Sequence, residues 1–89
     1  MAEPIDEYRI TGHASFEMER RGIDEAILRK VLTGPEQRHT LRPGRDVLQS
    51  KIEFEGKTYV VRVIVDVDPK PAEVVTAYRA SNIAKYWRT

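Results

Sequence analysis

The chain has 89 residues, which is material for one domain with one hydrophobic core. Its 15 basic and 14 acidic side chains give a formal net charge of +1, so the chain as a whole is not basic. It has no cysteine, which excludes disulfides, a thiol nucleophile and thiolate metal sites. It has neither an apolar leader nor an apolar run near the ~20 residues that span a bilayer, and we expect a cytoplasmic protein.

The charges are unevenly placed along the chain. Residues 1–26 are rich in acids, whereas residues 76–89 carry Arg79, Lys85 and Arg88 and no acid. Such asymmetry creates a local basic surface on a near-neutral protein. An ordinary solvated surface is an equally weighted alternative.

The first elements are a short strand and a helix. Residues 1–6 read as a loose leader, and residues 8–11 alternate apolar and polar side chains, which predicts a strand. A helix is expected over residues 12–21, with Thr11 as its N-cap and Gly22 as its C-terminal stop.

The second helix is the most strongly indicated element. Asp24 is its expected N-cap, and Ile23 is expected to pack on Leu28 across that cap. We expect Gly34, in a left-handed conformation, and Pro35 to end it. Its predicted buried stripe consists of Ile27, Leu28, Val31 and Leu32.

The second half of the chain reads as strands. Residues 48–55 and 58–67 predict a hairpin with a turn at residues 56–57, and residues 73–79 predict a further strand after the break at 68–71. Residues 38–45 are a weaker candidate, for either a strand or a loop that bends at Pro43-Gly44, and Ser81 is expected to cap a short final helix. The prediction is one α+β domain over residues 1–89. Two N-terminal helices pack on one face of a three- to four-stranded antiparallel sheet, and a short C-terminal helix follows.

The polar residues suit metal-independent RNA cleavage. That chemistry moves one proton from the ribose 2′-hydroxyl and another to the leaving oxygen, and it needs positive charge at the phosphate. Proton-transfer candidates are His13, His39, Glu17 and Tyr78, and phosphate-binding candidates are Arg21, Arg42, Arg62 and Arg79. No cofactor or metal is predicted, although His13 and Glu17, one helical turn apart, are a minor candidate for a shared metal.

Several of these residues have structural alternatives. Tyr78 reads as a packing residue more readily than as a catalytic one, and Arg21 as the partner of an acid such as Asp24. Arg62 is the most informative, because it interrupts a valine-rich central strand. It is expected on an open polar face of the sheet, or paired.

Two stretches resemble a known family. The first reads ITGHA over residues 10–14 and continues to RGID over residues 21–24; the second reads VTAYR over residues 75–79, followed by IAKYW over residues 83–87. In this order, over nearly the whole chain, they resemble the bacterial domain-of-unknown-function family 4258. That family typically shows a threonine-x-histidine-alanine start, an arginine-glycine-isoleucine helix break and a late threonine-x-tyrosine-arginine strand.

The resemblance implies the fold of the barnase, colicin and RelE-type ribonucleases, with which the family has been grouped, and a role as a toxin. It carries site roles over to His13, Arg21, Thr76, Tyr78 and Arg79. Many members have an arginine one turn after the histidine, where this chain has Glu17. A carboxylate at that place repels phosphate, which weakens the case for an active nuclease.

Two functional hypotheses result. In the first, the chain is a metal-independent ribonuclease, a toxin that cleaves RNA such as messenger RNA and has an antitoxin protein as its partner. Its predicted catalytic residues are His13, Tyr78 and Arg79, and its predicted phosphate-binding residues are Arg21, Arg42, Arg62, Thr76 and Lys85. In the second, the chain is a non-catalytic module on the same scaffold that binds a protein or RNA.

Overall fold

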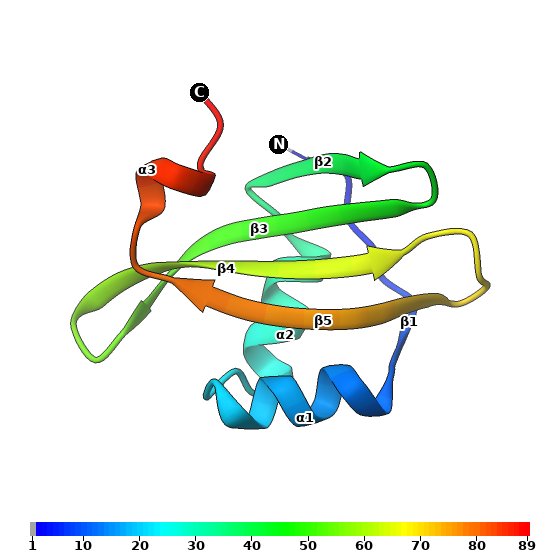
Figure 1. The fold of residues 1–89 in the computed structure, drawn as a ribbon, viewed down its shortest axis with the longest axis horizontal. Helices are drawn as coiled ribbons and strands as arrows, with labels where there is room; N and C mark the ends of the chain where they lie inside the picture. The colour runs from blue at the N-terminus through cyan, green and yellow to red at the C-terminus, as the bar shows by residue number, and fades with distance from the viewer. Residues whose placement is uncertain (1) are drawn as a thin grey trace.

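In the computed structural model, which describes residues 2–89, two helices pack against one face of a five-stranded sheet (Figure 1). The elements are β1 (Tyr8–Ile10), α1 (Gly12–Arg20), α2 (Glu25–Thr33), β2 (Gln37–Arg42), β3 (Arg45–Phe54), β4 (Lys57–Asp66), β5 (Ala72–Ala80) and α3 (Ile83–Tyr86). This confirms the α+β class, the two N-terminal helices and the short C-terminal helix.

The sheet differs from the predicted three- to four-stranded antiparallel one. Its strand order is β1-β5-β4-β3-β2, and β1 pairs with β5 in parallel, so that the sheet is five-stranded and mixed. The hairpins β2–β3, β3–β4 and β4–β5 are antiparallel, as expected. The prediction was wrong because a parallel pair joins segments far apart in the chain, and no local turn signals it.

Both long helices begin at the predicted caps. The Thr11 side chain accepts a hydrogen bond from Ala14 N, and the Asp24 side chain accepts one from Ile27 N. Helix α1 ends one residue earlier than predicted, and Gly22 follows with a positive φ of 68°. Gly34 was wrongly expected in the left-handed region, since its φ is −144°. Helix α2 ends there because the following Pro35 disfavours the helical conformation at Gly34.

The strands β3, β4 and β5 begin and end one to three residues away from the predicted bounds, and a turn and a cap also differ from prediction. Phe54 pairs with Lys57, so the β3–β4 turn consists of Glu55 and Gly56 rather than Gly56 and Lys57. Both turn residues have positive φ, 51° and 82°, which matches the twist of a two-residue hairpin. Asn82, rather than Ser81, caps α3, because the helix begins one residue later than expected.

The core lies between the two helices and the sheet. Residues 1–6 were expected to be a loose leader, and Met1 lies outside the described residues. Ile5 is held to α2, since its backbone N–H donates a hydrogen bond to the carbonyl of Leu32 at 2.7 Å. No helix within residues 2–89 is long and apolar enough to cross a membrane. The buried core residues are Ala14, Met18, Ile23, Leu28, Val31, Leu32, Leu48, Ile52, Val61, Val63, Val65, Val74 and Ala77.

Candidate functional site

Arg62 lies on the face of the sheet opposite α1 and α2. Its neighbours Val61 and Val63 belong to the helix-facing core, and successive strand residues point to opposite faces. The strand register aligns Gln49, Arg62 and Tyr78 across β3, β4 and β5. Arg62 Nε donates to Gln49 Oε1 at 2.8 Å, and Arg62 Nη1 donates to the Tyr78 hydroxyl at 2.6 Å.

Helix α3 covers this arginine with an aromatic ring. The Tyr86 ring centroid lies 4.6 Å from Arg62 Cζ, and the Tyr78 centroid lies 5.7 Å from it. The two tyrosine rings meet edge to face at 6.1 Å. Only 8% of the Arg62 surface is exposed, so of the two alternatives from the sequence the open polar face is wrong, and the arginine is instead hydrogen-bonded to Gln49 and Tyr78. We call Gln49, Arg62, Tyr78 and Tyr86 the Arg62 cluster.

The charge of Arg62 has no acidic partner. None of the ion pairs among residues 2–89 involves it, and its two hydrogen-bond acceptors are a neutral amide and a hydroxyl. Taking a charge out of water is costly unless an opposite charge compensates for it. Aromatic faces offset part of that cost. A buried, uncompensated guanidinium is therefore a site with affinity for an anion.

Arg21 approaches the cluster from the end of α1. Its Nη1 donates a hydrogen bond to the carbonyl of Ala77 at 3.1 Å. Strand β1 pairs with β5 only at residues 72–74, so this carbonyl lies on the part of the β5 edge that β1 does not cover. Its Nη2 lies 3.3 Å from the buried Glu17 carboxylate, and its Cζ lies 5.9 Å from the Tyr78 ring centroid. Glu17 also pairs with Arg20, so two arginines engage its carboxylate.

Two further predicted residues lie beside the cluster. Lys85 Nζ is 5.3 Å from the Tyr86 ring centroid, and Thr76 lies two residues before Tyr78 on the same face of β5, opposite Ile64. The fold thus brings together Arg21, Arg62, Thr76, Tyr78 and Lys85 of the predicted site residues.

Arg79 lies on the other face of the sheet. It pairs with Val61, and its Cζ stacks 4.2 Å from the Phe54 ring centroid and 4.8 Å from that of Tyr59. The adjacent Tyr78 points the opposite way, since neighbouring strand residues alternate. These two predicted catalytic residues therefore do not share a face.

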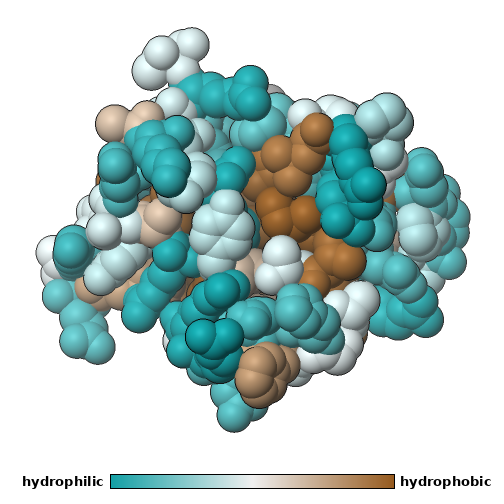
Figure 2. Space-filling model, viewed as in Figure 1, coloured by the Kyte–Doolittle hydropathy of each residue, from teal (hydrophilic) through white to brown (hydrophobic). Residues whose placement is uncertain are grey.

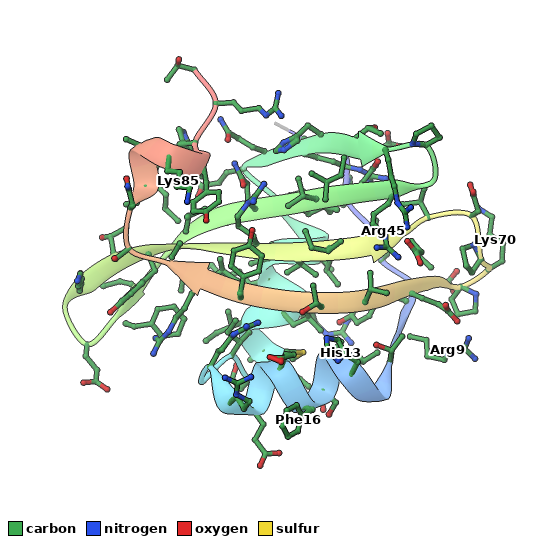
Figure 3. The ribbon with its side chains drawn as sticks, viewed as in Figure 1. Arg9, His13, Phe16, Arg45, Lys70 and Lys85 are labelled. Carbon is green, nitrogen blue, oxygen red and sulfur yellow. The ribbon has the colours of Figure 1, made fainter. Side chains whose placement is uncertain are left out.

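His13 and Arg42 lie away from the cluster. His13 is exposed in the first turn of α1, while Arg21 follows the last, and a helix rises ~1.5 Å per residue. Figure 3 shows His13 on α1 and Lys85 on α3, with the sheet drawn between them. Arg42 ends β2 near Asp66, where the hydrogen bond from Arg45 and, to a lesser extent, the charges of Arg45 and Arg42 lower the pKa of Asp66.

The second histidine shares the face of the cluster. His39 pairs with Val47, two residues before Gln49. Its Nδ1 is buried and has no hydrogen-bond partner within the described chain. Burial lowers the pKa of His39, as do the charges of Arg88 and Arg62, while Asp46 opposes them. His39 is therefore held in its neutral form, which can accept a proton.

Sequence reasoning missed three members of this site. Gln49 and Tyr86 contact Arg62 directly, and Gln37 Oε1 accepts a hydrogen bond from Gln49 Nε2 at 2.7 Å. A glutamine within an alternating strand reads as a solvated residue, and only the register places it opposite an arginine. The one available signal was Arg62 itself, since a charge in a buried strand requires partners.

The view of Figure 2 looks onto the face opposite α2. Apolar residues gather over the middle of the sheet and are bordered by polar side chains.

An open hollow of about 850 Å³ lies elsewhere, between the N-terminal segment and the β4–β5 loop, and no predicted site residue lines it. Among residues 2–89, no group of three or more histidine, aspartate and glutamate side chains is arranged to hold a metal ion.

The fold and the site define a small α+β domain with a buried cationic and aromatic cluster on one sheet face. The chain belongs to the domain-of-unknown-function family DUF4258, whose model matches residues 10–79. This match confirms the family resemblance. No curated protein and no solved structure matches the chain.

Proposed function

We propose that this chain binds RNA through the Arg62 cluster. The observation that carries the proposal is the burial of Arg62 without an acidic partner within residues 2–89. A guanidinium presents a fork of donors that matches the oxygens of a phosphate. The phosphate of a nucleic acid backbone supplies the missing negative charge.

The surroundings of Arg62 favour nucleic acid over a simple anion. Arg62 Cζ and Arg21 Cζ lie 5.7 and 5.9 Å from the Tyr78 ring centroid, and Lys51 lies on the same face of β3 as Gln49. The Asp66 carboxylate on this face is engaged by Arg45, at 2.6 and 3.0 Å. Cations interleaved with aromatic rings are typical of surfaces that bind unpaired bases and their phosphates.

The test is the affinity of the full chain for a fluorescently labelled single-stranded RNA, measured by anisotropy. Arg62→Gln removes the charge and retains an amide donor for its neighbours. We expect it to weaken binding about tenfold or more, since a hydrogen bond to a charged group contributes roughly 1.5 to 3 kcal/mol. Lys30→Gln, on the exposed side of α2, is the matched control and should bind as wild type does. Equal affinity of wild type and Arg62→Gln would refute the proposal.

A second candidate function is metal-independent cleavage of the bound RNA. Two observations favour it: Arg62 donates to the Tyr78 hydroxyl, and His39 is held neutral on the same face. Arg62 would hold the phosphate, while Tyr78 and His39 would transfer protons. If the chain cleaves RNA, it shares the fold and activity of the barnase, colicin and RelE-type ribonucleases, with which the family has been grouped. It would then act as a toxin on messenger RNA, and its antitoxin would cover the same face.

The cleavage candidate is tested with purified protein and RNA in excess chelator. His39→Ala and Tyr78→Phe should each lower the cleavage rate by about a hundredfold, the usual contribution of a general acid or base. His13→Ala and Arg79→Ala, which alter the originally predicted site, should leave the rate unchanged. Loss of cleavage in those two variants alone would return the catalytic site to His13 and Arg79. Binding without cleavage by wild type would leave the non-catalytic module.

A further inference from the structure

The C-terminal segment, residues 82–89, lies across the Arg62 cluster. The carbonyl of Tyr86 accepts a hydrogen bond from Gln49 Nε2 at 3.0 Å. The backbone N–H of Arg88 donates to Gln37 Oε1 at 3.1 Å, and the carbonyl of Arg88 accepts from Gln37 Nε2. The main chain of this segment therefore forms hydrogen bonds with the side-chain amides of both Gln37 and Gln49.

The segment itself is weakly held. Helix α3 has four residues and none of them is buried. Its N-cap is Asn82, whose side chain accepts from Lys85 N at 3.3 Å. So short a helix is marginal without tertiary support, and elements with few buried apolar contacts open at low free-energy cost.

The contacts of this segment are those that a nucleotide would make. The Gln37 amide donates one hydrogen bond to the carbonyl of Arg88 and accepts another from the N–H of the same residue, and a glutamine pairs with the edge of a base through the same two groups. The Tyr86 ring lies 4.6 Å from Arg62 Cζ, where an unpaired base would stack on the guanidinium plane.

We infer that residues 82–89 occupy the nucleotide site, and that an unpaired RNA nucleotide binds by displacing them. This inference rests on the proposed RNA binding and specifies its ligand. The base stacks on Arg62 in place of Tyr86, and its edge pairs with Gln37 and Gln49. A base within a duplex has its faces and its pairing edge already occupied, so the ligand is single-stranded.

Hydrogen–deuterium exchange of the full chain measures the displacement. Ligand binding ordinarily slows exchange, whereas displacement should make residues 82–89 exchange faster when an unlabelled single-stranded RNA is added. Asn82→Ala removes the cap of α3 and should tighten RNA affinity by about fivefold, since loss of a cap changes helix stability by that order. Ser81→Ala, one residue earlier and outside the cap, is the matched control and should bind as wild type does.

The outcomes separate this inference from the proposed function. Faster exchange of residues 82–89 together with tighter binding by Asn82→Ala supports the displacement. If RNA binds through Arg62 while residues 82–89 exchange more slowly and Asn82→Ala binds no tighter, the segment is part of the binding surface and the inference is overturned. If neither wild type nor Asn82→Ala binds RNA, the inference and the proposed function both fail.

Discussion

His39 and Arg62 show what burial does to two cationic side chains on one face. Arg62 keeps its charge because a guanidinium does not lose its proton in a protein, so its partners must accommodate the charge. For His39 the neutral form is favoured instead, because burial and the charges of Arg88 and Arg62 lower its pKa. One face of the sheet thus holds a permanent cation and a neutral base.

His39 should make stability depend on pH. Because its pKa is lowered in the folded state, the unfolded chain binds the proton more readily below its usual value of 6.5. Its contribution is therefore fully present above pH 6.5 and is lost as the pH falls toward the lowered value. His39→Gln, which cannot take up a proton, should flatten the urea-unfolding midpoints across this range.

The control for that measurement is His13→Gln, which replaces the exposed histidine of α1. It should retain the wild-type pH dependence. A His39→Gln protein that loses as much stability as wild type on acidification would show that His39 is not the group responsible.

The sequence allows some functional residues to be recognised, but it does not show which residues contact them in the fold. Arg62 was recognisable because a charge in a run of valines must be either solvated or paired. Gln49, Gln37 and Tyr86 were not, since their roles depend on strand register and on where α3 returns. The prediction that His13 and Arg79 share a catalytic site rested on the family motifs, and a motif does not tell which face of a strand a residue occupies.

Among the elements, those with local signals were predictable. Helix α2 carries its cap, its buried stripe and its terminating proline within twelve residues, from Asp24 to Pro35. Strand β1 has a recognisable pattern, but its parallel partner β5 lies more than sixty residues along the chain. Element type is therefore encoded locally, whereas the edge at which a strand joins the sheet is decided by the whole fold.

The β3–β4 turn is an element that substitution should improve. Glu55 has a φ of 51°, a region that disfavours residues other than glycine, asparagine and aspartate. Glu55→Asn gives the asparagine-glycine pair that such a turn prefers. We expect it to raise the free energy of unfolding by roughly 0.5 to 1 kcal/mol, measured by urea denaturation.

The matched control is Glu53→Asn, in the preceding strand, where asparagine is disfavoured. It should leave stability unchanged or lower it. A gain of similar size in both variants would mean that the removal of a negative charge, rather than turn geometry, is responsible.

At the scale of the whole molecule, the net charge is +1 and the basic residues of the C-terminal segment lie on one face. The helices carry exposed acids and bases together, such as Glu25 and Lys30, whereas the cations Lys51, Lys85 and Arg88 lie on or beside the face with Arg62. Because few cations lie on this face, the proposed RNA binding should show modest salt sensitivity. The sequence indicated the basic tail, and the fold brings it next to Arg62.

The central claim is that Arg62 contacts a phosphate of single-stranded RNA. The most direct measurement is the salt dependence of RNA affinity for wild type and Arg62→Gln. Each phosphate contact on a single strand contributes about 0.7 to the slope of log affinity against log salt. We predict that the Arg62→Gln slope is smaller by about that amount. Parallel slopes would contradict the claim, because Arg62 would then hold no phosphate.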